Sequence, residues 1–241
     1  MASKPGLSLV MPCYNEEACV EEVVSSWITE IQKRLRDFEM VVVNDGSKDR
    51  TAEILHRMES RFGELRVLTQ ENRGHGPALL NGYRSARGEW IFHTDSDNQF
   101  VPEDFWKLWG VRDRSPYVMG IRMHRDDPWH RLLLSRTLRW IGFILTGIRV
   151  HDINIPFKLI RRDLLGKILL AIPGDTFAPS ILLAIGAHRL GVKITEIGVR
   201  HLPRKTGQTV LKPWKLAKSC ARAFRQLRRF CVEFRPAARA G

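Results

Sequence analysis

The feature that most constrains the fold of this chain is a regular alternation of patterns over its first hundred residues. Short apolar runs, each typical of a buried strand, alternate with longer stretches in which apolar residues recur at steps of three and four. The predicted strands are Leu7–Met11, Met40–Val43, Leu65–Leu68 and Trp90–His93, and the predicted helices are Glu16–Asp37, Lys48–Phe62 and Gly74–Ala86. This alternation predicts an α/β fold, with a mostly parallel sheet and helices on both faces.

Polar residues follow directly after three of these predicted strands. They are Tyr14, Asn15, Glu16, Asn44, Asp45, Asp95 and Asp97. Parallel strands bring their carboxyl ends to one edge of a sheet, and open α/β sheets bind ligands at that edge. The sequence therefore predicts that these side chains converge on one site.

The second half of the chain is less regular. It predicts strands at Tyr117–Ile121 and Lys193–His201 and helices at Trp129–Thr146, Asp163–Ala171 and Phe177–Leu190. No internal repeat or low-complexity linker interrupts it. The expected organisation is one domain over residues 1–210 and a C-terminal arm over residues 211–241.

Most of the net charge of +13 lies in the arm and the few residues before it. From Arg204 to Gly241 there are eleven Lys or Arg and one acid, a net charge of +10. Apolar residues recur there at steps of three and four, at Trp214, Ala217, Ala221, Phe224, Leu227, Cys231 and Phe234. This pattern predicts a basic amphipathic helix that lies in a membrane surface, and the alternative is that its apolar stripe packs on the domain. No nucleic-acid motif accompanies the charge, so nucleic-acid binding is not expected.

The cysteine content and the short apolar runs predict a cytoplasmic location. The four cysteines show neither zinc-ligand spacing nor a paired framework, which suits a reducing compartment. The opening MASKPGLSLVMP is too short an apolar run for a signal peptide, and no stretch reaches the length of a spanning helix. We expect a cytoplasmic protein that associates peripherally with the inner face of a membrane.

Two carboxylates stand two residues apart after the fourth predicted strand. Side chains alternate in an extended segment, so Asp95, Asp97 and Gln99 would share one side. Their oxygen atoms suit Mg²⁺ or Mn²⁺ shared with the phosphates of a substrate. The structural alternative is that these acids cap a following helix.

Four segments, in order and at these spacings, resemble the family-2 glycosyltransferases, particularly the dolichyl-phosphate mannose synthase and polyprenyl-phosphate sugar transferase group. The segments are Val10-Met-Pro-Cys-Tyr-Asn-Glu-Glu17, Val41-Val-Val-Asn-Asp-Gly-Ser-Lys-Asp49, Asn72-Arg-Gly-His-Gly76 and Asp95-Ser-Asp-Asn-Gln99. The resemblance covers roughly residues 7–105. It implies a GT-A-type domain, with residues 1–105 as the nucleotide-binding half and 106–210 as the acceptor half, and an inverting sugar transfer.

The resemblance also implies roles for individual residues of the first half. Those expected to bind the nucleotide-sugar are Pro12, Tyr14, Glu16, Val43, Asp45, Asp95, Ser96, Asp97 and Gln99, and of these Val43 and Asp45 would line the base and ribose. Asp95, Asp97 and Gln99 would hold the metal. The structural alternatives are that Tyr14 is an aromatic at the rim, that Glu16 favours a helix N-terminus, and that Asp45 is a turn residue.

The resemblance continues more weakly into the second half. Arg122 would contact the donor, help to steer the acceptor phosphate and, with Asp97 and Arg131, act in catalysis. Arg131, Ser135 and Arg136 would hold the acceptor phosphate, and Arg204 and Lys205 the pyrophosphate. Guanidinium groups suit phosphate geometry, although arginines at the edge of an apolar helix can also simply extend towards water. Asp152, in a stretch resembling the same group, would position acceptor or sugar, or else cap a local turn.

A missing feature favours a phosphate acceptor. Many inverting relatives with hydroxyl acceptors carry a Glu-Asp pair as base, but the corresponding region here is Thr176-Phe-Ala-Pro-Ser180. A phosphate oxygen is already ionised at neutral pH and needs no base. The hypothesis is transfer from a nucleotide-sugar to a polyprenyl or dolichyl phosphate. The alternatives are a hydroxyl acceptor, or a non-catalytic protein that binds a nucleotide-sugar or a nucleic acid.

Overall fold

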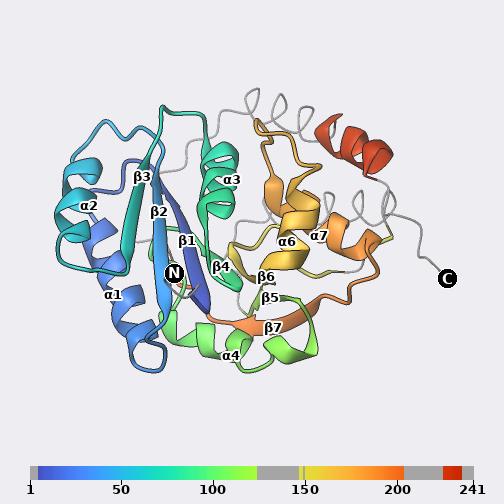
Figure 1. The fold of residues 1–241 in the computed structure, drawn as a ribbon, viewed down its shortest axis with the longest axis horizontal. Helices are drawn as coiled ribbons and strands as arrows, with labels where there is room; N and C mark the ends of the chain where they lie inside the picture. The colour runs from blue at the N-terminus through green and yellow to red at the C-terminus, as the bar shows by residue number, and fades with distance from the viewer. Residues whose placement is uncertain (1–4, 124–146, 149, 204–224, 235–241) are drawn as a thin grey trace.

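The structure is a computed structural model that describes residues 5–123, 147–148, 150–203 and 225–234 (Figure 1). Its strands are β1 (Leu7–Cys13), β2 (Phe38–Asn44), β3 (Leu65–Thr69), β4 (Trp90–Thr94), β5 (Tyr117–Arg122), β6 (Phe157–Arg161) and β7 (Thr195–Val199). Its helices are α1 (Val20–Gln32), α2 (Thr51–Glu59), α3 (His75–Ser85), α4 (Phe105–Trp109), α6 (Arg162–Leu169) and α7 (Pro179–Arg189), with short 3-10 turns η1 (Pro102–Asp104) and η2 (Arg112–Arg114).

The seven strands form one mixed sheet in the order β3-β2-β1-β4-β6-β5-β7. Strands β1 to β4 pair in parallel, as the sequence predicts, and β5 pairs in parallel with β7. Strand β6 runs antiparallel to both of its neighbours, β4 and β5. The carboxyl ends of β4, β5 and β7 therefore lie at one edge of the sheet, together with the start of β6.

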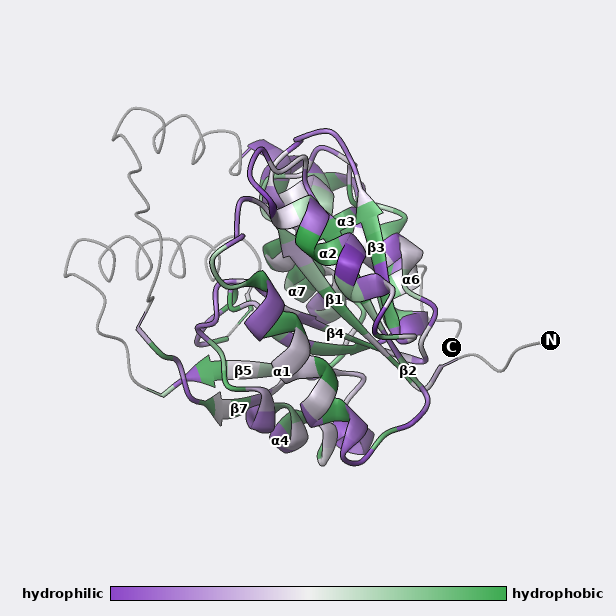
Figure 2. Cartoon of the chain, turned by 90° about the vertical axis from the view of Figure 1, so that its left-hand side faces the viewer, coloured by the Kyte–Doolittle hydropathy of each residue, from purple (hydrophilic) through white to green (hydrophobic). Residues whose placement is uncertain are grey.

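Helices cover both faces of this sheet. Helices α3, α6 and α7 pack together on one face, and α1 contacts α2 and η1 on the other (Figure 1). Figure 2 shows hydrophobic and hydrophilic segments alternating along helices such as α1 and α3, as expected when one side faces a core. The α/β prediction is confirmed.

The core between the sheet and α1 is rich in aromatic rings. Phe92 of β4 lies 5.3 Å from Trp27 of α1, 4.8 Å from Phe157 of β6 and 5.0 Å from Phe105 of α4, measured between ring centroids. Every residue of β1 and β4 is buried, which suits strands covered on both faces. This packing holds the ends of β1 and β4 in fixed positions at the edge of the sheet.

The structure differs from the sequence prediction at the start of one helix and in one additional strand. Helix α1 begins at Val20 instead of Glu16, because the chain first turns at Asn15, whose φ is 54°. The strand β6 was not predicted, because Lys158 interrupts its apolar run, yet Lys158 is fully buried. The predicted helix at Trp129–Thr146 lies outside the described residues.

The described part of the C-terminal arm is a helix over residues 225–233 that packs on the domain. Phe230 is 2% exposed and Phe234 is 8% exposed, and their rings stack with centroids 4.9 Å apart. Arg189 of α7 donates hydrogen bonds to the carbonyl groups of Cys231 and Phe234 at the end of this helix. In this part of the arm the apolar stripe faces the domain, which is the alternative to the expected membrane anchor.

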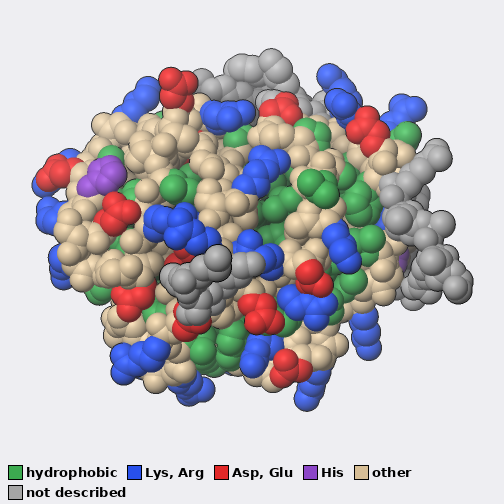
Figure 3. All heavy atoms as spheres, viewed as in Figure 1, with side chains coloured by type: hydrophobic (Ala, Val, Ile, Leu, Met, Phe, Trp, Pro, Cys, Tyr) green, Lys and Arg blue, Asp and Glu red, His purple; other side chains and the backbone are tan. Residues whose placement is uncertain are grey.

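Charged side chains are mixed on the face seen in Figure 3, where Lys and Arg alternate with Asp and Glu. This agrees with the low net charge of the chain before Arg204. In the described ranges of the chain, no helix has the length and apolarity needed to span a bilayer.

Candidate active site

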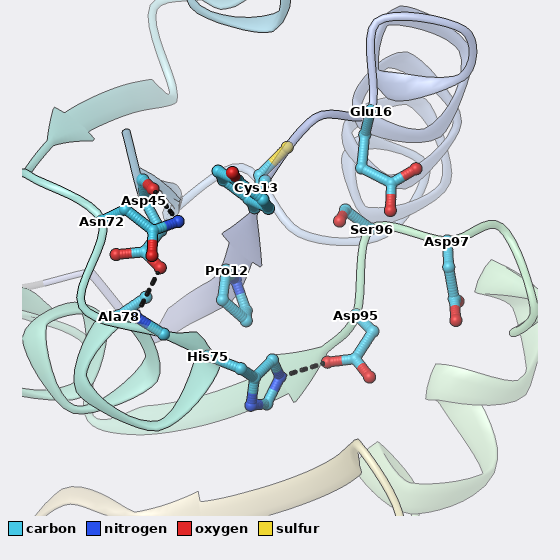
Figure 4. Close-up of a pocket in the computed structure, with 12 residues that line it drawn as sticks. Pro12, Cys13, Glu16, Asp45, Asn72, His75, Ala78, Asp95, Ser96 and Asp97 are labelled. Carbon is cyan, nitrogen blue, oxygen red and sulfur yellow. Dashed lines mark hydrogen bonds and ion pairs between the residues drawn. The ribbon is translucent and has the colours of Figure 1, made fainter. Parts of the chain in front are cut away.

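A pocket of about 380 Å³ lies at the carboxyl ends of β1, β2 and β4 (Figure 4). It is lined by Pro12, Cys13, Tyr14, Glu16, Asp45, Asn72, Gly74, His75, Ala78, Asp95, Ser96 and Asp97. The parallel pairing aligns the strand ends, since Cys13 is in register with Asn44. The structure thus brings together most of the polar residues that the sequence places after separate strands.

Asp95 and Asp97 lie on one wall of the pocket (Figure 4). The chain bends after Asp95, and Asn98 has a φ of 57°, so the segment is not extended and the alternation of side chains stops there. Gln99 consequently does not line the pocket, and its side-chain amide donates a hydrogen bond to the carbonyl of Leu202, 3.1 Å away. The spacing argument that grouped Gln99 with the two aspartates therefore does not hold in this conformation.

Two histidines that the sequence analysis did not single out contact Asp95. His75, the first residue of α3, places Nε2 3.1 Å from Asp95 Oδ1, and His93 of β4 places Nε2 3.4 Å from the same oxygen. Burial lowers the pKa of His93 to about 4, against the opposing effect of Asp95. Burial also opposes ionisation of Asp95, but His75 and His93 together outweigh it and lower the pKa of this carboxyl group.

The positions of these histidines offered a usable signal. His75 belongs to the Asn72–Gly76 segment quoted above. His93 precedes Asp95 by two residues at the end of a predicted strand, and the alternation of side chains along a strand puts His93 and Asp95 on the same side.

Asp45 is buried and shapes the loop that precedes α3. Its carboxylate accepts hydrogen bonds from the side chain of Gln70 at 2.7 Å and from the backbone N–H groups of Arg73 at 2.9 Å and Gly74 at 2.8 Å. Asp45 therefore lines the pocket and also organises its wall, as the structural alternative expected, while its contact with a base or ribose stays a prediction. Val43 differs from expectation, because its side chain is fully buried in the core, where it faces Gly82 of α3, and it is not among the pocket-lining residues.

Residues at the end of β1 and directly after it form another part of the pocket lining. Pro12 is the penultimate residue of β1, and Tyr14 is 41% exposed at the rim. The backbone N–H of Glu16 donates to Thr51 Oγ1 at 2.8 Å, which leaves the Glu16 carboxylate on the pocket side (Figure 4). Ser96 is buried between this wall and the aspartates.

Arg122 and Asp152 form an ion pair at the same edge of the sheet. Arg122 Nη1 lies 3.2 Å from Asp152 Oδ2, and neither residue lines the pocket. Lys158 of β6 lies behind them and donates a hydrogen bond to the carbonyl of Ile153 at 3.0 Å, and burial lowers the pKa of its ammonium group to about 7. Lys158 is the buried charge that sequence patterns did not assign to any site.

Five predicted site residues lie outside the described residues. They are Arg131, Ser135, Arg136, Arg204 and Lys205. Their expected contacts with phosphate groups stay predictions.

The sequence matches the family described as "Glycosyl transferase family 2" over residues 8–169. Among curated proteins, it is 30% identical over 206 residues to the undecaprenyl-phosphate 4-deoxy-4-formamido-L-arabinose transferase of Edwardsiella ictaluri (strain 93-146), covering 84% of this chain and 62% of that protein. It is also 30% identical over 213 residues to the protein of the same name from Pseudomonas aeruginosa (strain LESB58), covering 87% of this chain and 61% of that one. The chain thus spans somewhat less than two thirds of these relatives.

Among solved structures, the chain is similar to glucosyl-3-phosphoglycerate synthase from Mycobacterium tuberculosis. In complex with Mn²⁺, uridine diphosphate and glucosyl-3-phosphoglycerate, that protein superposes with a TM-score of 0.68 at 21% identity, covering 97% of this chain and 82% of that chain. Its complex with Mn²⁺, UDP-glucose and glycerol 3-phosphate also gives 0.68, at 22% identity and with the same coverage. At this identity the similarity shows a shared fold.

Proposed function

The chain belongs to glycosyl transferase family 2, and we propose that it moves a sugar from a nucleotide-sugar to a polyprenyl phosphate, with inversion at the anomeric carbon. Its fold is the GT-A type that the sequence resemblance implied. The observation that carries the proposal is the pocket that joins Asp95 and Asp97 to the residues after β1 and β2. In that arrangement two carboxylates that could bind a cation line a pocket of about 380 Å³, in which part of a nucleotide-sugar could bind.

The two carboxylates on the pocket wall are suitable ligands for a divalent cation. Asp95 and Asp97 present carboxylate oxygens on the pocket wall, and hard oxygen ligands suit Mg²⁺ or Mn²⁺. The solved neighbours with this fold were determined with Mn²⁺ and uridine nucleotides, which supports the same assignment here. When bound, the cation offsets the negative charge of the leaving diphosphate. Gln99 would join this set only if its amide left the carbonyl of Leu202.

The protein's own residues would hold the donor in place. We assign the nucleotide to the wall formed by Pro12, Tyr14 and Glu16 and to the loop that Asp45 organises. Ser96 lies between the two aspartates and would meet the diphosphate. Arg204 and Lys205 are proposed to reach the pyrophosphate from the later part of the chain, because cationic side chains pair well with phosphate oxygens.

The acceptor assignment rests on charge and on the lack of a Glu-Asp pair in the segment Thr176–Ser180. Arg122, Arg131, Ser135 and Arg136 would bind the phosphate of the lipid, and Arg122 is already at the same edge of the sheet as the pocket. A phosphate oxygen attacks as an anion, so no general base is required. The names of the curated relatives, which specify undecaprenyl phosphate, support this class of acceptor.

We propose that the reaction takes place at the cytoplasmic face of a membrane, where a lipid phosphate would be presented. The basic residues after Arg204 support this, because each Lys or Arg near an anionic leaflet contributes about 1 kcal/mol to attachment. In this proposal the arm binds by charge, and its described apolar stripe remains packed on the domain.

The decisive experiment is a transfer assay with purified protein. Short-chain polyprenyl phosphate is incubated with Mg²⁺ or Mn²⁺ and a panel of radiolabelled nucleotide-sugars, and the label is followed into the lipid fraction. We expect label to reach the lipid with one donor and to disappear on chelation of the metal. Transfer of label to a neutral hydroxyl acceptor, with the lipid phosphate unlabelled, would exclude the proposed acceptor class.

A matched pair of variants tests the metal-binding role. Asp97→Asn removes a charge from the pocket wall and should lower kcat at least about 100-fold, the range seen when one electrostatic contact to a transition state is lost. Asp113→Asn removes an acid from η2, away from the pocket, and should leave kcat unchanged. Equal activity of the two variants would refute the role of Asp97.

A further inference from the structure

Three side chains beside the pocket form a cluster, and two of them, both histidines, have no part in the proposed sugar transfer. One ring nitrogen of His75, one ring nitrogen of His93 and one carboxylate oxygen of Asp95 all lie within 4.8 Å of one another. They come from the start of α3, from β4 and from the residue after β4. Figure 4 shows the ring of His75 turned towards Asp95, while the second oxygen of Asp95 points away from His75.

His93 brings to this cluster two buried ring nitrogens that no hydrogen bond within the described residues satisfies. Its side chain is 1% exposed, and neither ring nitrogen makes a hydrogen bond within the described part of the chain, although Nε2 lies 3.4 Å from Asp95 Oδ1. A buried polar atom without a partner is destabilising, and an unseen ion is one recognised explanation for it. The ring packs edge-on against Tyr83 at 5.8 Å between centroids, which fixes its orientation with Nε2 towards Asp95.

The spacing of the cluster matches that of metal ligands. Zinc bonds of about 2.0–2.1 Å in a tetrahedral arrangement place neighbouring ligand atoms about 3.3 Å apart. The separations from Asp95 Oδ1 are 3.1 Å to His75 Nε2 and 3.4 Å to His93 Nε2. The His75 side chain is 55% exposed, so it has room to adjust, and both His75 and Asp95 line the pocket.

We propose that His75, His93 and Asp95 form a binding site for an imidazole-preferring transition metal of the Zn²⁺ class. Two neutral imidazoles and one carboxylate favour Zn²⁺ or Co²⁺, whereas Mg²⁺ prefers oxygen ligands and octahedral geometry. The site is therefore chemically distinct from the all-oxygen set of Asp95 and Asp97.

Occupancy of this site should act on the sugar transfer, an inference that rests on the proposed function. Asp95 belongs to both ligand sets. Zn²⁺ bound by the two histidines would occupy the Asp95 carboxylate, which could then no longer bind the donor metal together with Asp97. Zn²⁺ should then inhibit transfer in the presence of excess Mg²⁺, and His75→Ala should relieve this inhibition.

The test is Co²⁺ binding to the full-length, untagged protein after removal of metals. Tetrahedral Co²⁺ with nitrogen ligands gives intense visible absorption, which reports the ligand set without any enzyme activity. We expect one such Co²⁺ per chain, displaced by Zn²⁺, with a Kd at least about tenfold higher in His75→Ala. His56→Ala is the matched control, because His56 is an exposed histidine of α2 away from the pocket.

Two further variants separate this site from the donor metal and from folding defects. His93→Phe keeps a buried aromatic ring beside Tyr83 but removes the nitrogen ligands, and it should abolish the spectrum while near-ultraviolet circular dichroism remains native. Asp97→Asn should keep the spectrum. A spectrum unchanged in His75→Ala, or lost in Asp97→Asn, would overturn the proposal. Failure of lipid labelling with an intact Co²⁺ spectrum would instead refute the proposed function and leave this site standing.

Discussion

Gly76 lies where the first turn of α3 meets the loop formed by residues 175–177. A Cβ atom at Gly76 would stand 2.0 Å from the carbonyl oxygen of Thr176 and 2.9 Å from that of Phe177. Both neighbours are backbone atoms, so a shift of the helix or the loop is needed to relieve the clash. Because His75 precedes Gly76, this close approach also fixes the position of a pocket residue.

Gly76→Ala should therefore destabilise the protein by about 1–3 kcal/mol, the range for overpacking, and should also weaken Co²⁺ binding through His75. Urea unfolding and the Co²⁺ spectrum measure the two effects. Gly166→Ala is the control, because Gly166 lies inside α6 with nothing within 4 Å of the added atom. That change should stabilise the protein by about 0.5–1 kcal/mol. A Gly76→Ala variant as stable as the wild type would contradict the packing argument.

At the scale of elements, an ion pair joins the end of β7 to η1. Asp104 is 1% exposed and accepts a hydrogen bond from the backbone N–H of Arg200 at 2.6 Å and another from its guanidinium Nη2 at 2.8 Å. Lys107 Nζ lies 3.0 Å from the same carboxylate. Burial opposes ionisation of Asp104, but the hydrogen bonds from Arg200 outweigh it and lower the pKa of the carboxyl group.

This contact predicts a definite pH dependence. The pKa of Asp104 in the folded state is below its ordinary value of 3.8, so its stabilising effect is complete above that pH and is lost as the pH falls through the folded pKa. Asp104→Asn should lower the free energy of unfolding by about 1–3 kcal/mol at pH 7. The difference from wild type should shrink below about pH 4.

Urea unfolding between pH 3 and pH 8 measures this difference, with Glu103→Gln as control. Glu103 lies 3.8 Å from Arg200 but is exposed, so its replacement should change stability by less than about 0.5 kcal/mol at any pH. A constant gap between wild type and Asp104→Asn down to pH 3 would show that the carboxylate charge is not what stabilises this junction.

At the scale of the whole molecule, the helix over residues 225–233 is part of the folded domain. Besides burying Phe230 and Phe234, it carries Gln226, whose side chain accepts a hydrogen bond from the N–H of Phe177 at 2.9 Å and donates one to the carbonyl of Asp175 at 3.2 Å. The loop held in this way is the one that meets Gly76. The C-terminal helix is thus linked through this loop to the wall of the pocket.

Phe230→Ala should accordingly lower the stability of the entire domain, by about 3–5 kcal/mol, because it removes a buried ring and leaves a cavity. Val232→Ala, in the same helix but 64% exposed, should have an effect below about 0.5 kcal/mol. Thermal unfolding followed by both far- and near-ultraviolet circular dichroism tests this. Unfolding of the C-terminal helix alone, with the domain transition unchanged, would show that the helix is an independent arm.

The sequence by itself determined the order of strands and helices in the first hundred residues, because apolar periodicity is a local property that reports which face of each element is buried. It also determined that Tyr14, Asp45 and Asp95 meet, since parallel strands align their carboxyl ends whatever packs around them.

The tertiary structure decided the rest, because those features depend on contacts between distant segments. His75 reaches Asp95 only once α3 crosses the sheet, and Lys158 is buried only because β6 inserts antiparallel between β4 and β5. The apolar stripe of the C-terminal arm would suit a membrane or a protein core equally well, and for residues 225–234 only the tertiary contacts, which bury Phe230 and Phe234, show that it packs on the domain.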